Sequence, residues 1–211
     1  LEAGTAPGKI IATTRTPEKL ADFSEKGVIV RQADFDDPAS LAEAFTSVDR
    51  LLLISTDALD VPGRRLKQHQ NAVKAAEEAG VSHVVYTSLI NPVNTPVFLA
   101  PDHVATEAAL AASKMGWTLL RENIYTEMLL GSIGQALGSG QLFSAAGDGK
   151  AAYITREDCA LAAAAALASS FSGQRTLNIT GPEAVSQYDV AAIGAQVTGQ
   201  PITYIPLELE S

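Results

Sequence analysis

Short apolar segments of strand length alternate with segments of helical length between residues 10 and 120 of this 211-residue chain. The apolar segments are uninterrupted runs, which is typical of strands buried on both faces of a sheet. They span residues 10–12, 28–30, 50–54, 83–86 and 117–120. The helical segments that separate them span residues 17–26, 40–48, 62–79 and 100–114. This order predicts an α/β fold, a Rossmann-like doubly wound parallel sheet.

Small polar residues follow the predicted strands. Ligands of parallel sheets bind in the crevice beyond the carboxyl ends of the strands, so we expect these residues to line one cleft. They are Thr14, Arg15, Asp34, Ser55, Thr56, Asp57, Thr87, Ser88 and Asn123. The alternative is that strand ends are polar simply because loops meet solvent.

The segment KIIATTRTPEKL at residues 9–20 carries the most specific of these signals. Arg15 follows the apolar run, and Pro17 occupies the first turn of the next helix, where its missing N–H is not needed. In dinucleotide folds an arginine at this place accommodates the 2′-phosphate of NADP, whereas an acidic residue selects NAD. The segment therefore favours NADPH as the cofactor, and the alternative is a solvated surface arginine.

Charge and cysteine content restrict the function further. The net charge of −9 disfavours a nucleic-acid groove, because phosphate binding needs a basic surface. The single cysteine, Cys159, permits no intrachain disulfide, and we expect it to be a buried structural residue. No Cys/His cluster indicates a metal site. No apolar run has the ~18 residues of a membrane span, and we expect no signal peptide, so the predicted location is the cytoplasm.

Two further groups of ionisable residues are expected to be structural. The acidic run at residues 34–37 precedes Pro38 and a helical segment, where carboxylates stabilise the positive end of the helix dipole. His69 and His83 have no carboxylate or cysteine at metal-ligand spacing. We therefore expect both histidines at the surface or at a strand edge.

The pattern loosens beyond Tyr125. Helical segments are predicted up to about residue 138 and over residues 158–169 and 186–197, with Ser186 as an N-cap. Short strands are predicted at residues 142–146, 175–179 and 202–205. We therefore predict a dinucleotide-binding domain over residues 1–125 and a smaller part over residues 126–211 that forms the substrate side.

Six ordered motifs resemble those of one known family. They are RTP at 15–17, RQADFDD at 31–37, LLLIST at 51–56, YTSL at 86–89, LRENIY at 120–125 and AAGDGK at 145–150. The chain resembles the NmrA-like atypical short-chain dehydrogenases, and within them the bacterial NADPH-dependent quinone oxidoreductases of type 2. The resemblance covers nearly the whole chain.

This resemblance implies a set of site residues. Arg15 would pair with the 2′-phosphate through charge-assisted hydrogen bonds. The implied cofactor-binding residues are Arg15, Asp34, Phe35, Ser55, Asp57, Ala58, Leu59, Thr87, Ser88, Asn123, Ile124, Tyr125, Thr126, Glu127 and Met128. Tyr125, Phe143 and Tyr153 could stack on a flat quinone, and the alternative for Phe143 and Tyr153 is core packing.

The chain departs from the family pattern at its start. Members of the family begin with a strand and a glycine-rich turn that holds the pyrophosphate. Here the residues before Gly8 resemble the end of a helix that closes at Gly4. We therefore expect that the first strand and the glycine-rich loop are missing from this chain by truncation.

The second departure concerns the proton donor. Short-chain dehydrogenases typically use a Tyr-x-x-x-Lys pair, where this chain has His103 and Glu107. His103 titrates near neutrality and could protonate a hydroquinone anion, although water could do the same. The alternative is a histidine on the cleft rim without a catalytic role.

Two classes of function remain open at this stage. The motifs favour an NADPH-dependent oxidoreductase that reduces a quinone or a similar aromatic acceptor by direct hydride transfer, as a possible homodimer. The alternative is a non-catalytic NmrA-like regulator that senses NAD(P). Reduction of an imine, a dye or an aromatic ether would use the same cleft, because the fold alone does not fix the substrate.

Overall fold

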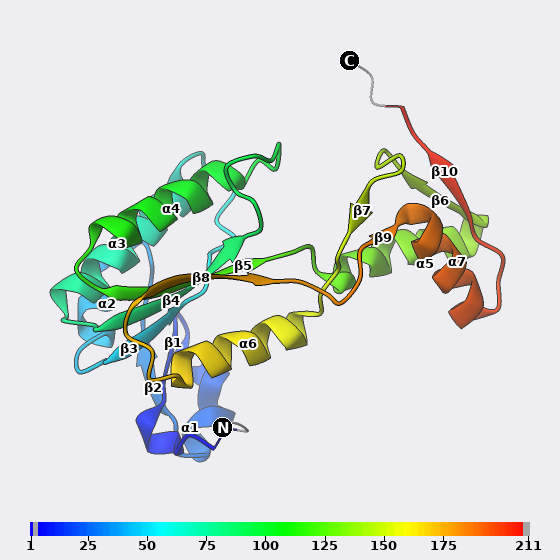
Figure 1. Cartoon of the computed structure of the whole chain (residues 1–211). Coiled ribbons are helices and arrows are strands. Elements are labelled where there is room, and N and C mark those ends of the chain that lie inside the picture. Colours follow the sequence, from blue (N-terminus) through cyan, green and yellow to red (C-terminus); the bar gives the residue numbers. More distant parts are fainter. Residues whose placement is uncertain (2–3, 209–211) are drawn as a thin grey trace. The chain divides into compact units, whose positions relative to one another are not determined.

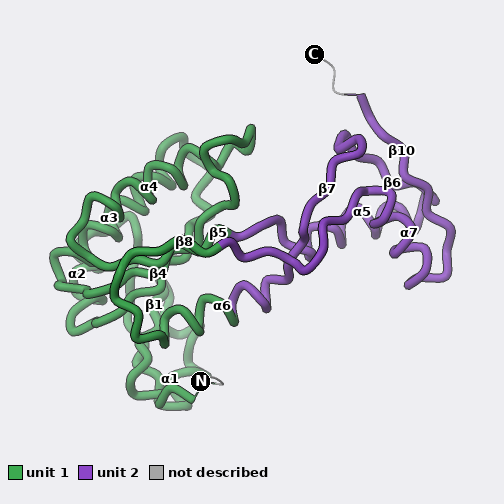
Figure 2. The backbone as a smooth tube through the Cα atoms, viewed as in Figure 1, with its two compact units in different colours: residues 1–121, 161–177 green, residues 122–160, 178–211 purple. Residues whose placement is uncertain are grey.

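The computed structural model describes residue 1 and residues 4–208, and it divides the chain into two compact units. Unit 1 comprises residues 1–121 and 161–177, and unit 2 comprises residues 122–160 and 178–211 (Figure 2). Residues 161–177 thus return to unit 1 after the chain has left it. The predicted boundary between residues 125 and 126 did not anticipate this return. The helix end expected before Gly4 falls on residues 2 and 3, which lie outside the described residues.

Unit 1 contains two sheets. The first pairs β1 (Ile11–Thr14) with β2 (Ile29–Gln32) in parallel, with Ile11 opposite Ile29. The second has the order β3-β4-β5-β8, and its strands are β3 (Arg50–Leu53), β4 (His83–Leu89), β5 (Gly116–Glu122) and β8 (Gln174–Ile179). Strands β3 and β4 are parallel, and every residue of β4 except the last is buried. The predicted Rossmann-like α/β fold is confirmed.

Three helices cover one face of the four-stranded sheet (Figure 1). They are α2 (Pro38–Ala44), α3 (Arg64–Glu78) and α4 (Ala100–Ala112), and α3 packs between the other two. The end of α6 (Arg156–Ala168) lies on the opposite face. The chain before β2 adds the short helices η1 (Pro7–Lys9), η2 (Pro17–Leu20) and α1 (Ala21–Glu25). The core between sheet and helices contains Leu41, Leu53, Tyr86 and Leu110, each at most 1% exposed.

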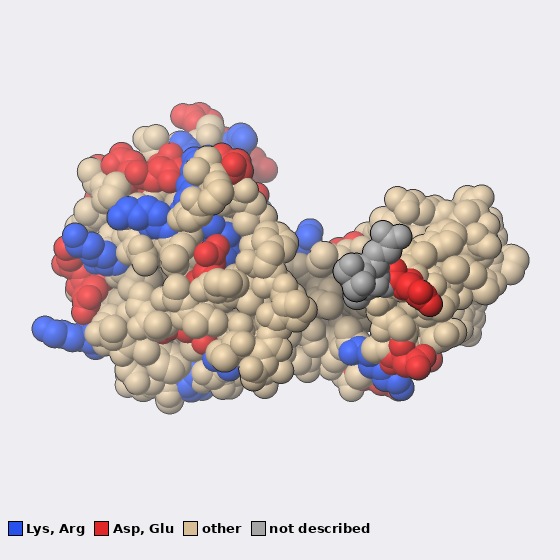
Figure 3. Space-filling view, turned by 90° about the horizontal axis from the view of Figure 1, so that it is seen from above, with Lys and Arg blue, Asp and Glu red and all other residues tan. Residues whose placement is uncertain are grey.

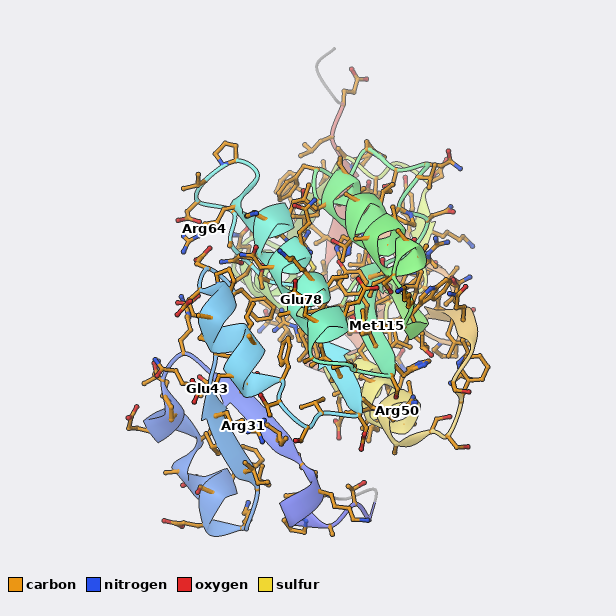
Figure 4. The ribbon with its side chains drawn as sticks, turned by 90° about the vertical axis from the view of Figure 1, so that its left-hand side faces the viewer. Arg31, Glu43, Arg50, Arg64, Glu78 and Met115 are labelled. Carbon is orange, nitrogen blue, oxygen red and sulfur yellow. The ribbon has the colours of Figure 1, made fainter. Side chains whose placement is uncertain are left out.

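Local capping explains where several helices begin and end. The Asp37 carboxylate accepts a hydrogen bond from the Ala39 N–H at the start of α2, which confirms the structural interpretation of the acidic run. At the other end of α2, Arg31 donates to the carbonyls of Ala44 and Thr46, and Figure 4 shows Arg31 beside this helix. Gly80 closes the end of α3 in the left-handed conformation (φ 78°), which glycine adopts without strain.

Unit 2 is built around a second apolar cluster that contains Leu142, Val190 and Tyr204. Its elements are η3 (Thr126–Met128), α5 (Leu129–Ser139), β6 (Gln141–Ser144), β7 (Lys150–Ala151), β9 (Val185–Ser186), α7 (Gln187–Thr198) and β10 (Thr203–Pro206). Strand β6 pairs in parallel with β10, and β7 pairs antiparallel with β9. The Ser186 hydroxyl and the Asp189 carboxylate form a capping box at α7, so the predicted N-cap is confirmed.

The prediction for two histidines was wrong. His69 and His83 are both fully buried, His69 on α3 and His83 at the start of β4. His69 bonds through both ring nitrogens and His83 through Nε2 to groups from other elements, which a local sequence pattern does not reveal. Among the described residues, no helix is long and apolar enough to cross a membrane.

Candidate cofactor cleft

The carboxyl ends of β1, β2 and β3 and the loop between β3 and α3 enclose a cleft of about 730 Å³ in unit 1. This volume is in the range of small-molecule sites, ~300–1,000 Å³. Its lining residues are Thr13, Thr14, Arg15, Ala33, Asp34, Phe35, Ile54, Ser55, Thr56, Asp57, Ala58, Leu59, Asp60, Arg64 and Gln68. Seven of the residues predicted to bind cofactor therefore lie together, namely Arg15, Asp34, Phe35, Ser55, Asp57, Ala58 and Leu59.

The two arginines of the cleft differ in their partners. Arg15 is exposed just after β1, and within the described part of the chain no group binds its guanidinium. Arg64 at the start of α3 donates to the Asp36 carboxylate (2.6 and 3.1 Å) and to Asp60 (2.7 Å). The bond from Arg64 lowers the pKa of Asp36, and its own pKa is raised in return. Arg15 is thus the cation that remains available for an anionic ligand.

Gln68 leaves an unsatisfied acceptor beside the cleft. Its Nε2 donates to the Asp36 carboxylate (3.0 Å), and because a carboxylate only accepts, this bond fixes the orientation of the amide. The Oε1 atom is buried, and none of the described residues gives it a hydrogen-bond partner. A buried acceptor without a donor is destabilising by roughly 1–3 kcal/mol.

Thr87 and Ser88 lie near the end of β4, and both are buried. The Thr87 hydroxyl accepts from the Ser55 N–H (2.8 Å), so it holds the loop after β3. The Ser88 hydroxyl donates to Glu107 on α4 (2.6 Å), and Arg121 at the end of β5 binds the same carboxylate through Nε (3.0 Å) and Nη2 (2.6 Å). This bidentate pair raises the pKa of Arg121. Thr87 and Ser88 do not line the cleft itself.

His103 lies inside α4 and is only 5% exposed. Its Nε2 accepts from Arg65 (3.0 Å), because a guanidinium can only donate, and its Nδ1–H donates to the Tyr86 hydroxyl (2.9 Å). Burial lowers the pKa of His103 to about 4, and the Arg65 charge adds to this effect. A neutral, enclosed imidazole is poorly suited to protonate a substrate, so these contacts favour a structural role over the predicted catalytic one.

The predicted cofactor residues from Asn123 to Met128 belong to unit 2. Asn123 caps the Ile124 N–H with its own side chain (2.8 Å). The Tyr125 hydroxyl donates to Glu122, and the Arg156 guanidinium lies 5.3 Å above the Tyr125 ring. Burial raises the pKa of both Glu122 and Tyr125.

The next three residues differ in their contacts. Thr126 donates its N–H to the Ile154 carbonyl (2.8 Å), and the Glu127 carboxylate accepts from the Arg156 N–H (2.9 Å). The Met128 side chain is exposed.

The two other residues predicted to stack on a substrate have different surroundings. Phe143 on β6 is 49% exposed. The Tyr153 ring packs against the apolar cluster of unit 2, and its hydroxyl accepts from Gln187 (2.8 Å). Tyr153 is therefore held in the manner of a core residue, whereas Phe143 presents its ring to the surface.

Sequence reasoning missed three residues of the cleft on or before α3, namely Asp60, Arg64 and Gln68. A signal for the last two existed, because Arg64 and Gln68 are four residues apart and share a helix face. The same spacing relates Arg65 to His69, whose side chains lie below the loop after β3. A search for polar residues four apart in the first turns of the helix after a strand would have found both pairs.

Two other kinds of site, a metal site and a basic surface, depend on the remaining ionisable groups. Among residues 1 and 4–208, no cluster of three or more His, Cys, Asp or Glu residues could hold a metal ion. Cys159 is buried, as predicted, and burial raises the pKa of its thiol to about 12. On the face shown in Figure 3, acidic and basic side chains of unit 1 are interspersed without a continuous basic surface.

Comparison with known proteins gives consistent relatives. The model of a family described as NAD(P)H-binding matches residues 2–170. Quinone oxidoreductase 2 of Escherichia coli is 39% identical over 196 residues, which are 93% of this chain and 68% of that protein. The crystal structure of the NADPH-dependent quinone oxidoreductase of E. coli with NADPH has a TM-score of 0.93 at 37% identity and covers 98% of this chain and 72% of that one.

A second solved structure is also similar. It is the Citrobacter sp. triphenylmethane reductase complexed with NADP(H), with a TM-score of 0.91 at 33% identity, covering 99% of this chain and 73% of that one. The chain thus spans about two thirds to three quarters of the length of these relatives. Both the family match over most of the chain and the identity to the E. coli protein lead to the same conclusion: the chain belongs to the NAD(P)H-binding family.

Proposed function

We propose that this chain binds NADPH and reduces a quinone-type acceptor by direct hydride transfer. The observation that carries the proposal is the unpaired guanidinium of Arg15 at the cleft formed by the strand ends, in a member of the NAD(P)H-binding family. A phosphate supplies the charge and the acceptor oxygens that an unpaired guanidinium lacks. Similarity to quinone oxidoreductase 2 of E. coli supports a quinone as the substrate class.

The residues of the cleft fit such a cofactor. Arg15 would bind the 2′-phosphate, and Asp34 and Phe35 would flank the adenine, near the unsatisfied acceptor of Gln68. The loop with Ser55, Asp57, Ala58 and Leu59 would follow the ribose and the pyrophosphate. Thr87 and Ser88 would lie towards the nicotinamide. Residues 123–128 are further proposed cofactor contacts. Tyr125, Phe143 and Tyr153 are proposed substrate contacts.

The chemistry supplied by a bound NADPH is transfer of a hydride, which converts a quinone into a hydroquinone anion that needs one proton. The chain contributes mainly by binding and orientation, which can supply a large part of a rate enhancement. Water is the proposed proton source, because both ring nitrogens of His103 are already engaged. The role of His103 as proton donor to the hydroquinone anion stays a prediction.

Organisation and location belong to the same proposal. Residues 1–125 would supply most of the dinucleotide site and residues 126–211 the substrate side. The partner would be a small quinone or a similar aromatic molecule, and the chain would act in the cytoplasm as a homodimer. Sedimentation of the purified chain and fractionation of cells that express it test the last two points.

Titration calorimetry of the purified chain with NADPH and with NADH tests the cofactor. We expect NADPH to bind more tightly, and Arg15→Ala to weaken NADPH binding about 10- to 100-fold with little effect on NADH, the range for hydrogen bonds between charged groups. Lys19→Ala removes another exposed cation near β1 that does not line the cleft, so it serves as the matched control. Equal loss in both variants would refute the role of Arg15.

A steady-state assay then tests the reaction. We expect NADPH to be consumed only when a quinone is added, with one quinone reduced per NADPH. Tight NADPH binding without turnover of any quinone would overturn the enzymatic proposal and favour the regulatory alternative.

A further inference from the structure

Thr56, in the loop between β3 and α3, has both of its backbone polar groups bound by side chains of α3. The Thr56 N–H donates to His69 Nε2 (3.0 Å), and the Thr56 carbonyl accepts from Arg65 Nε (2.6 Å). Both side chains come from α3, and both are almost fully buried, with Arg65 3% and His69 0% exposed. Thr56 itself lines the cleft between Ser55 and Asp57. The two backbone polar groups of a cleft residue are thus bound by side chains instead of by a neighbouring strand.

The hydrogen-bond partners of His69 determine which of its ring nitrogens carries the proton. A backbone N–H can only donate, so His69 Nε2 must be an unprotonated acceptor. The proton of the neutral ring therefore lies on Nδ1, which donates to the Thr106 hydroxyl (3.0 Å). Thr106 in turn donates to the Asp102 carbonyl (2.7 Å). Burial lowers the pKa of His69 to about 3, so the acceptor persists at neutral pH.

A second layer of contacts holds Arg65. Its Nη2 donates to His103 Nε2 (3.0 Å), and its Nη1 lies 3.4 Å from the Asp102 carboxylate. His103 is anchored by Tyr86 (2.9 Å), whose side chain is fully buried. A buried guanidinium with so many fixed partners has little freedom to move, so the direction of its Nε–H towards Thr56 is set.

We propose that Arg65 and His69 are positioning residues of the cleft: they hold Thr56, and with it the loop from Ser55 to Leu59, in the conformation that receives the cofactor. In this arrangement His103 positions Arg65 instead of reacting with substrate. The inference rests on the proposed function for the identity of the cofactor, NADPH. The fixation of the loop rests on the contacts alone.

The test compares three variants of buried histidines. His69→Leu removes the acceptor for the Thr56 N–H, whereas in His69→Gln the side-chain amide oxygen can replace it. His83→Leu is the matched control, because His83 is equally buried and bonds to Thr118 (3.0 Å) at the other end of the sheet. The readouts are the dissociation constant for NADPH and the hydrogen-exchange rate of the Thr56 amide measured by NMR without ligand.

We expect His69→Leu to weaken NADPH binding about tenfold, the order expected for one lost buried hydrogen bond, and to accelerate Thr56 exchange. His69→Gln should restore both readouts to within about twofold of the original chain, and His83→Leu should leave both unchanged. A general loss of packing would affect His69→Leu and His83→Leu alike and would not be rescued by glutamine, so that result would overturn the proposal.

If His69→Leu does not fold, variants of Arg65 test the other contact, the hydrogen bond to the Thr56 carbonyl. Arg65→Met should weaken NADPH binding, and Arg65→Lys, which keeps a charged donor, should recover part of it. Unchanged affinity in Arg65→Met would overturn the proposal. If the unaltered chain binds no NADPH, the proposed function fails, and the Thr56 exchange rates still decide whether His69 holds the loop.

Discussion

At each end of the four-stranded sheet in unit 1, an arginine side chain donates hydrogen bonds to backbone carbonyls, but the carbonyls differ in their place in the fold. At the cleft end, Arg65 and His69 bind the backbone of Thr56 in a loop. At the opposite end, Arg50 donates to the carbonyls of Ala166, Leu167 and Phe171 (2.8–3.2 Å). Figure 4 shows Arg50 and Arg64 at these opposite ends of the unit.

The difference lies in what each arginine fixes. The carbonyls of Ala166 and Leu167 end α6, where a helix leaves its last carbonyls without intrahelical partners, so Arg50 satisfies a need of the fold. The Thr56 carbonyl belongs to a loop that lines the cleft, so Arg65 prepares a surface for a ligand. An arginine bound to backbone carbonyls therefore indicates a functional role only when the segment that carries those carbonyls is known to line a site.

The largest expected effect is a loss of stability in acid, and buried histidines at both ends of the four-stranded sheet contribute to it. Burial lowers the pKa of His69 to about 3 and the pKa values of His83 and His103 to about 4, from 6.5. As pH falls from 6.5 towards 4, the unfolded chain binds protons that the folded chain excludes, so stability falls. The raised pKa of Glu122 has the opposite sign, so it offsets part of this difference in bound protons.

The net difference of up to two protons predicts that the free energy of unfolding falls by about 3 kcal/mol per pH unit in this window. Urea unfolding at a series of pH values measures the slope. His69→Leu and His83→Leu should each reduce it by about one proton, whichever end they come from. A slope unaffected by either change would mean that these histidines are already charged in the folded chain.

The second prediction separates the two ends by their target. Arg50→Met should lower the free energy of unfolding by about 2–3 kcal/mol, because the carbonyls of Leu167 and Phe171 lose their donor and that of Ala166 keeps only the Ser169 N–H. NADPH affinity should not change, since Arg50 does not line the cleft. Chemical denaturation and calorimetry measure the two quantities, and a parallel loss of affinity would remove the distinction between the ends.

The third prediction concerns the ion pair between Glu107 and Arg121. Glu107→Gln leaves the Arg121 guanidinium, 28% exposed, without its carboxylate, and removes the acceptor charge for Ser88. The free energy of unfolding should fall by about 1–2 kcal/mol, less than for a fully buried pair because solvent screens the arginine. Thermal unfolding followed by circular dichroism measures the change, and Glu107→Asp provides the control that keeps the charge.

The smallest effect is expected for Asp60→Asn. Asp60 is one of two partners of Arg64 and is 60% exposed, and Asp36 binds the same guanidinium through two N–H groups. Stability should change by less than about 0.5 kcal/mol. A larger loss in a urea titration would show that the loop after β3 depends on this surface contact more than on the buried one at Thr56.

Local patterns in the sequence were enough for much of the fold. The apolar runs located the strands, the acidic run at residues 34–37 marked the start of α2, and Ser186 marked the start of α7. Six of the nine residues predicted from the strand ends line one cleft, because parallel strands bring their carboxyl ends to one edge. Each of these inferences needs only local spacing or a general rule of sheet geometry.

Contacts between distant segments could not be predicted in this way. His69 was expected at the surface or at a strand edge, and its burial could not be predicted because its partners, Thr56 and Thr106, are 13 and 37 residues away. The bond from Arg50 to Leu167 spans 117 residues, and with it residues 161–177 return to unit 1. The spacing of residues within one segment does not predict such contacts, since they depend on the order of the strands in the sheet.

The loop at residues 57–59 is fastened on both sides, by the buried contacts of Thr56 before it and by the Arg64–Asp60 pair after it. So short a span between two fixed points samples few conformations, and little ordering entropy is lost when a ligand arrives. Nucleotide exchange should therefore need no slow opening step of this loop. Stopped-flow binding should show a single phase whose rate rises linearly with nucleotide concentration, and the residence time should be set by the contacts of the ligand itself.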